Sequence, residues 1–212
     1  GLSTRKAIKR MMWGINPLYC GGKWETENGN GALMRILPLA FLKDRYTEEE
    51  FIKLIEDVAS LTHRHKRSKL ACIFYIEFAI HLIKGKDKTE AYNHTIDYLS
   101  ANCKKRYRSE FKYFKDILSK QIISSNREKI KSTGYVIDTL EAVLWCLFQN
   151  DTYEKTVLCA VNLGGDTDTI AALVGGLAGI CYGFSAIPDR WVQNVAKKED
   201  IEEMVRIFSL NI

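Results

Sequence analysis

Residues 162–169 read Asn-Leu-Gly-Gly-Asp-Thr-Asp-Thr and run directly into an apolar segment that ends at Tyr182. Two carboxylates and two hydroxyls follow a Gly-Gly pair, at the predicted start of a helix. Hard cations such as Mg²⁺ and Ca²⁺ bind carboxylate, hydroxyl and carbonyl oxygens. The pattern therefore makes Asp166, Asp168 and Thr169 candidate ligands of one such ion.

The same stretch has two other interpretations. Asp and Thr are favoured at helix N-caps and in first turns, so Asp166 or Asp168 could serve only as a cap. Residues 170–188 carry no charge and contain Gly175-x-x-x-Gly179, a pattern that transmembrane helices also show. The segment is rich in glycine and no basic cluster borders it, so a buried central helix is the favoured interpretation.

The bulk composition is that of an ordinary globular protein. A chain of 212 residues can bury a real core, and only three residues are proline. Few stretches alternate with period two, so we predict a single all-α domain over residues 1–212. The net charge is +5. Basic runs at 63–69 and 104–108 could attract phosphate or nucleic acid, but we interpret most of these charges as solvated surface.

Hydrophobic periodicity predicts ten helices joined by short connections. They are expected at residues 3–13, 47–61, 68–84, 89–100, 109–123, 135–148, 152–163, 170–182, 188–191 and 199–210. The first is expected to bury Ala7, Ile8, Met11 and Met12. The second begins with the capping box Thr47-Glu-Glu-Glu.

The six cysteines show no C-x-x-C spacing and lie in apolar helical patterns. We interpret them as reduced core residues of a cytoplasmic protein. Residues 3–13 lack the long apolar centre of a signal peptide. Since the chain starts without Met, we expect it to be a fragment or a processed chain.

A glycine-rich loop precedes the apolar run 36–40, and it contains two Asn-Gly pairs at residues 28–31. Asn-Gly commonly forms hairpin turns, but no alternating strands flank it here. A glycine-rich turn that leads into a helix N-terminus presents N–H groups to an anion, so a phosphate or pyrophosphate site is the second interpretation. His63 and His65 lack a third ligand nearby, which argues against zinc and for a ring that packs or lines a pocket.

Three blocks of the sequence resemble the ADP-ribosylglycohydrolase family, whose members include the dinitrogenase reductase-activating glycohydrolase. The blocks are residues 28–35 with 37–39, residues 132–141 and residues 163–172, and the minor block 61–63 fits as well. Their order and spacing agree with the family, and together they cover almost the whole chain.

The resemblance implies a compact, orthogonal multi-helix fold with an ADP-ribose pocket beside two Mg²⁺ ions, for which Mn²⁺ is the alternative. The residues that match the family's metal ligands are Asp166, Asp168 and Thr169. Those that match its substrate-binding positions are Asn28, Gly29, Asn30 and Gly31 at the phosphates and ribose, His63 on the same side, and Tyr135 at the adenosine part.

The resemblance also implies an activity, hydrolysis of the bond between ADP-ribose and a protein side chain. An arginine linkage is the favoured substrate, with a serine linkage or a small ADP-ribose conjugate as alternatives. The expected partners are ADP-ribose or an ADP-ribosylated protein, and neither nucleic acid nor membrane. Two N-terminal motifs of the family, a Gly-Asp block and a Thr-Asp-Asp block, are absent. The catalytic acid therefore stays unknown, and we expect half a metal site and little turnover from this chain.

Two non-catalytic alternatives stay open. A relative could bind ADP-ribose without cutting it, and the same fold serves as a structural lens crystallin. The intact acidic motif at 166–169 weighs against the structural alternative, because a purely structural protein has no need of clustered carboxylates.

Overall fold

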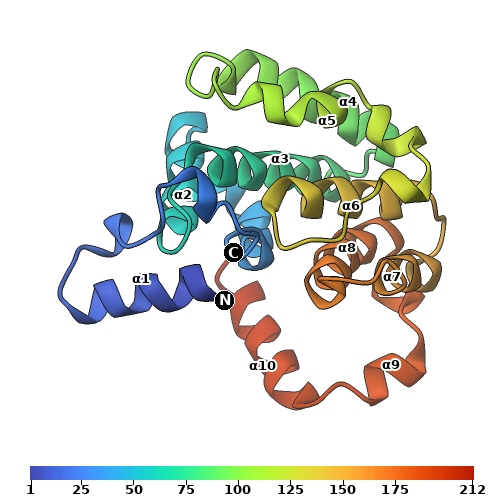
Figure 1. The fold of residues 1–212 in the computed structure, drawn as a ribbon. Coiled ribbons are helices and arrows are strands. Elements are labelled where there is room, and N and C mark those ends of the chain that lie inside the picture. The colour runs from blue at the N-terminus through green and yellow to red at the C-terminus, as the bar shows by residue number, and fades with distance from the viewer.

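The computed structural model describes residues 1–212, and its regular structure is helical, with no strand (Figure 1). The α-helices are α1 (Leu2–Met12), α2 (Glu48–Ser60), α3 (Lys66–Ile83), α4 (Lys88–Tyr98), α5 (Lys115–Leu118), α6 (Val136–Phe148), α7 (Tyr153–Val161), α8 (Thr167–Tyr182), α9 (Asp189–Gln193) and α10 (Lys198–Ser209). The prediction of an all-α fold is confirmed.

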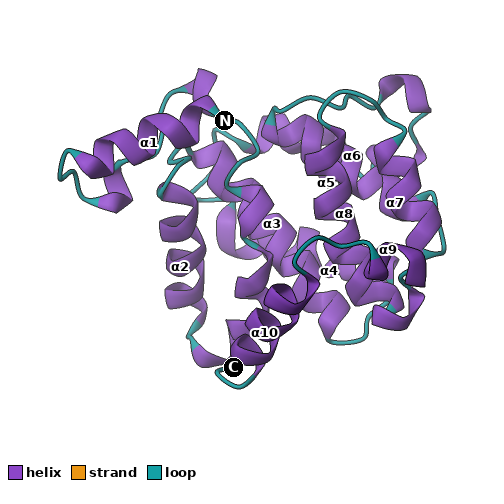
Figure 2. Cartoon of the chain, turned by 90° about the horizontal axis from the view of Figure 1, so that it is seen from below, coloured by secondary structure: helices purple, strands orange, loops and turns teal.

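Shorter helical turns fill many of the connections (Figure 2). The 3₁₀ helices are η1 (Pro17–Tyr19), η2 (Glu25–Glu27), η3 (Leu33–Arg35), η4 (Leu37–Arg45), η6 (Phe111–Phe114), η7 (Gln121–Ser124), η8 (Arg127–Lys129) and η9 (Phe184–Ala186). The segment η5 (Leu99–Cys103) is a π-helix. The predicted capping box is present, since Thr47 accepts from the Glu50 N–H and Glu50 accepts from the Thr47 N–H.

Helix α3 lies at the centre of the molecule, with 14 of its 18 residues buried. It runs between α4 on one side and α6 and α8 on the other, and α2 also packs against it (Figure 1). Of the 62 buried residues, 44 form one hydrophobic cluster. The sequence pattern indicated 170–182 as the central helix. That was wrong, because α8 buries one face and leaves residues such as Ala172 exposed.

The small residues of α8 let other elements approach it closely. A Cβ at Gly176 would lie 2.5 Å from Leu37 Cδ2, and the Tyr75 hydroxyl donates to the Leu173 carbonyl at 2.8 Å. None of the helices combines the length and apolarity needed to cross a bilayer. All six cysteines are free thiols. Four of them are buried as predicted, whereas Cys159 and Cys181 are half-buried.

The helix predicted at 109–123 is interrupted. It consists of η6, α5 and η7, and Lys120 turns the chain with a left-handed φ of 61°. The Tyr92 hydroxyl donates to the Ile117 carbonyl at 2.7 Å, so a side chain from another helix, α4, binds the backbone near the end of α5. Packing of Phe114 and Ile117 in the core therefore overrides the local helical pattern.

Helix α1 projects from the body of the protein in both views (Figures 1 and 2). Ala7 is its buried residue, whereas Ile8 is 50% and Met12 80% exposed. The prediction that these two side chains are buried was wrong, because no other helix packs along that face. Arg10 Nη1 donates to the Cys20 carbonyl at 2.8 Å and ties the helix to the following loop.

Candidate functional site

The glycine-rich loop around Asn30 lies against the segment that leads into α6, in an isolated antiparallel pairing. The Asn30 N–H donates to the Gly134 carbonyl at 3.0 Å, and the Val136 N–H donates to the Asn28 carbonyl at 3.0 Å. The loop's backbone partner therefore comes from a distant part of the chain. A local Asn-Gly hairpin, one of the two interpretations left open, is not formed.

Asp166 joins this pairing from a third segment. Its Oδ2 accepts from Asn30 Nδ2 at 2.6 Å, and the same amide nitrogen lies 2.9 Å from the Thr139 hydroxyl oxygen. The Asp166 N–H donates to the Ser132 carbonyl at 3.1 Å. Although Asp166 occupies the N-cap position of α8, its side chain makes no capping hydrogen bond. The carboxylate is directed to the loop instead, so capping alone does not explain the residue.

Gly165 allows this close approach. Its φ is +66°, and a Cβ at this position would lie 2.1 Å from the Ser132 carbonyl oxygen. Residues with a side chain rarely adopt such a φ, and here the obstacle is backbone. The Gly-Gly pair is thus required where residues 132–134 and the acidic motif meet.

The two other predicted metal ligands follow in the first turn of α8. Asp168 is exposed, and Thr169 is 4% exposed. The Thr169 hydroxyl lies 3.8 Å from Met34 Sδ, which is a weak acceptor. The oxygens of both residues are therefore free of strong structural hydrogen bonds.

The fit of these residues to a hard cation is partial. Two carboxylates and one hydroxyl are suitable oxygen ligands, but Mg²⁺ takes about six ligands in an octahedron. No group of three or more His, Cys, Asp or Glu side chains is gathered to hold a metal. Asp166, Asp168 and Thr169 could thus supply part of a coordination shell, with the remaining positions open to water, substrate or other groups.

His63 lies directly beneath the glycine-rich loop and is 2% exposed. A Cβ at Gly31 would lie 2.8 Å from His63 Cε1, and one at Gly29 would lie 3.2 Å from Nε2. Burial, with the nearby Arg35 charge as a smaller cause, lowers the pKa of His63 to about 4. The imidazole is therefore neutral near pH 7, with Nδ1 hydrogen-bonded to the Thr62 hydroxyl at 2.8 Å.

A cavity of about 570 Å³ opens over the loop and His63. Its lining residues are Gly1, Leu2, Ser3, Thr4, Gly29, Asn30, Gly31, Met34, Arg35, His63 and Gly134. Among the predicted site residues, Gly29, Asn30, Gly31 and His63 thus line one cavity. Asp166 and Thr169 each contact a residue that lines the cavity. Asp166 accepts a hydrogen bond from Asn30, and the Thr169 hydroxyl contacts Met34.

Residues 1–211 match the family model described as ADP-ribosylglycohydrolase. The chain belongs to the ADP-ribosylglycohydrolase family. It is 30% identical over 209 residues to ADP-ribosylarginine hydrolase Tri1 of Serratia proteamaculans (strain 568), covering 96% of this chain and 52% of that protein. It is 30% identical over 184 residues to the ADP-ribosyl-[dinitrogen reductase] glycohydrolase of Rhodospirillum rubrum, covering 84% and 54%.

A solved structure, described as an ADP-ribosylglycohydrolase-related protein complex, shares the fold with a TM-score of 0.75 and 28% sequence identity. It covers 96% of this chain, which corresponds to 66% of that structure. The expected fold of the ADP-ribosylglycohydrolase family is confirmed. The chain spans about half the length of the two curated relatives described above.

In this member of the family, the loop does not lead into an α-helix as predicted. It continues into the 3₁₀ helices η3 and η4. The α-helix N-terminus that the anion-site interpretation invoked is therefore not formed at this loop. Arg35 supplies a positive charge at the rim instead, held by bonds from its guanidinium to the Gly31 carbonyl at 2.6 Å and the Val58 carbonyl at 3.0 Å. Arg35, four positions after Gly31, is a charged residue of the block 28–35 to which the sequence prediction gave no role.

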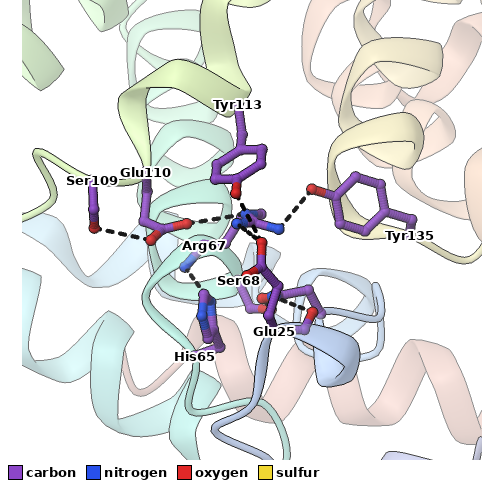
Figure 3. A network of polar contacts seen from close by, with 9 residues as sticks. Glu25, His65, Arg67, Ser68, Ser109, Glu110, Tyr113 and Tyr135 are labelled. Carbon is purple, nitrogen blue, oxygen red and sulfur yellow. Dashed lines mark hydrogen bonds and ion pairs between the residues drawn. The ribbon is translucent and has the colours of Figure 1, made fainter.

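Tyr135 and Asn28 are not among the residues that line the cavity. Tyr135 belongs to a polar network around Arg67 (Figure 3), and Asn28 is linked to it by hydrogen bonds with Ser68 and the Glu25 carbonyl. Arg67 Nη1 donates to the Tyr135 hydroxyl at 3.1 Å. Arg67, at 3% exposed, is an exception to the interpretation of most charges of the basic run 63–69 as solvated surface. Its partners are distant in sequence, so no local signal marked it as buried.

Proposed function

We propose that this chain forms the ADP-ribose-binding part of a Mg²⁺-dependent ADP-ribosyl hydrolase. The observation that carries the proposal is the bond from Asn30 to Asp166, which joins the glycine-rich loop to the acidic motif. The loop lines a cavity whose volume of about 570 Å³ falls in the range of small-molecule sites. One ligand could therefore contact the loop while a cation sits at the start of α8.

The cavity suits the phosphate and ribose groups of ADP-ribose. Gly29 and Gly31 carry no side chain, so phosphate oxygens can come close to the backbone. Arg35 contributes a fixed positive charge, which favours an anion. Neutral His63 offers Nε2 beneath the loop as a hydrogen-bonding group for a ribose hydroxyl or a phosphate oxygen.

The proposed metal site consists of Asp166, Asp168 and Thr169, with Mn²⁺ as the alternative to Mg²⁺. When bound there, the ion would lower the pKa of a bound water and orient ribose hydroxyls. Asn30 holds one oxygen of Asp166, which fixes the orientation of that carboxylate toward the cavity. Supporting hydrogen bonds of this kind orient metal ligands in many proteins.

An arginine linkage is the favoured substrate, because one relative with 30% identity is named an ADP-ribosylarginine hydrolase. In the proposed reaction, water adds to the anomeric carbon of the ribose, the bond from that carbon to the side-chain nitrogen breaks, and a proton passes to the leaving nitrogen. No residue of this chain is assigned as the proton donor. The six unpaired thiols suit a reducing compartment, so we propose a cytoplasmic protein.

Calorimetric titration of the chain with ADP-ribose, with and without Mg²⁺, tests the binding proposal. We expect binding that Mg²⁺ strengthens, and loss of the Mg²⁺ effect in Asp168→Ala. Asp189→Ala is the matched control, because Asp189 is also an exposed acid in the first turn of a helix. Equal loss in both variants, or no binding by the folded wild type, would contradict the proposal.

Release of ADP-ribose from an ADP-ribosylated arginine peptide separates the hydrolase from a protein that only binds. We expect little turnover from residues 1–212 alone, because they supply no assigned acid and an incomplete donor set. Rapid turnover that requires Asp168 would refute that expectation and establish the hydrolase. Binding without turnover, even when the chain is supplied with the N-terminal family motifs, would favour the non-catalytic alternative.

A further inference from the structure

Arg67, in the first turn of α3, connects three segments that are far apart in the sequence (Figure 3). Its Nε donates to Glu110 Oε2 at 3.0 Å, and its Nη2 donates to Glu25 Oε1 at 2.8 Å. Its Nη1 donates to the Tyr135 hydroxyl at 3.1 Å. The Arg67 and Glu110 side chains are 4% and 9% exposed, so their ion pair is largely screened from water, whereas Glu25 is 63% exposed.

Tyr113 stacks on one face of the Arg67 guanidinium. Its ring centroid lies 3.3 Å from Arg67 Cζ, and its hydroxyl donates to Glu25 Oε1 at 2.8 Å. A planar guanidinium can stack on an aromatic ring and use its N–H groups in the plane at the same time. A lysine at this position could keep the positive charge, but its ammonium group could not stack on the ring and donate in the same directions as the guanidinium N–H groups.

The next residue, Ser68, contacts the start of the glycine-rich loop. Its hydroxyl donates to Asn28 Oδ1 at 2.9 Å, and Asn28 Nδ2 donates to the Glu25 carbonyl at 2.9 Å. The first turn of α3 therefore holds both the segment before the glycine-rich loop and the Tyr135 phenol. Tyr135 is in turn paired with Gly29 through the backbone.

We propose that Arg67 is a positioning residue that sets the orientation of Tyr135 for the adenosine part of the ligand. This inference rests on the proposed function and on the expected contact of Tyr135, which directly follows the cavity-lining Gly134, with the adenosine part of ADP-ribose. Arg67 does not line the cavity, so we assign its effect to its hydrogen bond with the Tyr135 hydroxyl. The role predicts that Arg67 affects ligand affinity only while that hydroxyl is present.

A simple truncation cannot test this role, because Glu110 is 7% exposed and would lose its cation. Removing one partner of a buried ion pair is strongly destabilising. Arg67→Lys keeps the charge and removes the guanidinium geometry. Arg106→Lys is the matched control, since Arg106 also pairs with a buried acid, Glu56, but has no contact with the site.

The first measurement is made without ligand, on protein labelled with ¹³C at tyrosine Cζ. The Tyr135 resonance, assigned with Tyr135→Phe, is expected to shift in Arg67→Lys and to stay unchanged in Arg106→Lys. An unchanged Tyr135 resonance in folded Arg67→Lys would overturn the positioning role, whatever the ligand is.

The second measurement is a double-mutant cycle on the Kd for ADP-ribose. Arg67→Lys and Tyr135→Phe are each expected to weaken binding by about tenfold, and the double variant by no more than either alone. Additive losses would overturn the inference, because a merely structural Arg67 would act equally in both backgrounds. If the folded wild type binds no ADP-ribose while the Tyr135 resonance still shifts, the proposed function fails, and with it the assignment of the adenosine part to Tyr135.

Discussion

Asn30 and Asp166 are separated by 136 positions in the chain, yet Asn30 Nδ2 donates to Asp166 Oδ2 at 2.6 Å. Asn30 is 8% exposed, so the bond forms in a mostly desolvated place. A hydrogen bond to a charged acceptor is stronger than a neutral one, particularly away from water. This contact makes the loop and the acidic motif one unit, so a change in either residue should affect both.

Asn30→Ala should therefore lower the free energy of unfolding by about 2 kcal/mol, since a bond to a carboxylate is lost. It should also weaken ADP-ribose binding, because Asp166 loses its orienting partner. Urea denaturation and calorimetry measure the two effects. Asn126→Ala, at an exposed position, is the control. A stability loss no larger than that of the control would show that the bond contributes little.

Gly165→Ala should be among the most damaging small substitutions in the chain, with a loss of about 3 kcal/mol in the free energy of unfolding. The φ of +66° and the carbonyl oxygen of Ser132 both oppose a Cβ. Gly164→Ala has the same kind of φ but open space, so it should cost about 1 kcal/mol. Equal losses would mean that the clash with Ser132 is relieved by backbone movement.

Gly179→Ala provides the opposite case. Gly179 lies inside α8, and a Cβ at this position would meet nothing within 4 Å. Alanine has the higher helix propensity, so the free energy of unfolding should rise by about 0.5 to 1 kcal/mol. Thermal and denaturant unfolding measure this. A loss of stability would indicate that α8 needs a glycine at this position for a reason other than packing.

Thr169→Val should separate a metal ligand from a structural hydroxyl. Because the only hydroxyl contact is Met34 Sδ at 3.8 Å, its removal should change the free energy of unfolding by less than about 0.5 kcal/mol. The Mg²⁺ effect on ADP-ribose binding should fall. In the control Thr156→Val, stability should fall, because that buried hydroxyl donates to the Thr152 carbonyl at 2.7 Å. A stability loss in Thr169→Val equal to that of the control would make Thr169 structural.

His63 should make the stability of the protein depend on pH. Its pKa is lowered from 6.5 to about 4 in the folded protein, so between these values the unfolded chain binds more protons. The contribution of neutral His63 to the free energy of unfolding is complete above pH 6.5 and is lost as the pH falls toward 4. A shift of this size corresponds to about 3 kcal/mol. Denaturation of wild type and His63→Gln at pH 7 and pH 5 should show a flatter dependence in the variant. Burial also lowers the pKa of His81 to about 4, so part of the dependence should remain in His63→Gln.

Much of the fold could be predicted from periodicity, because most helices bury a stripe of apolar residues that repeats with the helical turn. The prediction failed at 109–123, where the Ile117 carbonyl binds a tyrosine from α4 and the chain turns at Lys120. It also failed for Met12, since an amphipathic pattern does not say whether another element will cover the apolar face.

The site was predictable to the extent that its residues are chemically unusual. Clustered carboxylates after Gly-Gly and repeated Asn-Gly pairs each allow a ligand-binding interpretation beside a purely structural one, and both patterns are visible in the sequence alone. The central position of α3 and the burial of Arg67 were not predictable, because a basic run looks the same whether its members face water or a distant carboxylate.

The sequence by itself determined the helical class, the positive-φ turn at Gly164 and Gly165, and the kind of ligand atoms available at Asp166, Asp168 and Thr169. These properties follow from local backbone freedom and from side-chain chemistry. Only the tertiary structure decided that Asn30 meets Asp166, that His63 lies beneath the loop, and that Arg67 holds Tyr135. Such contacts join segments far apart in the chain, and their geometry is fixed by the packing of the helices around α3 and not by any local pattern.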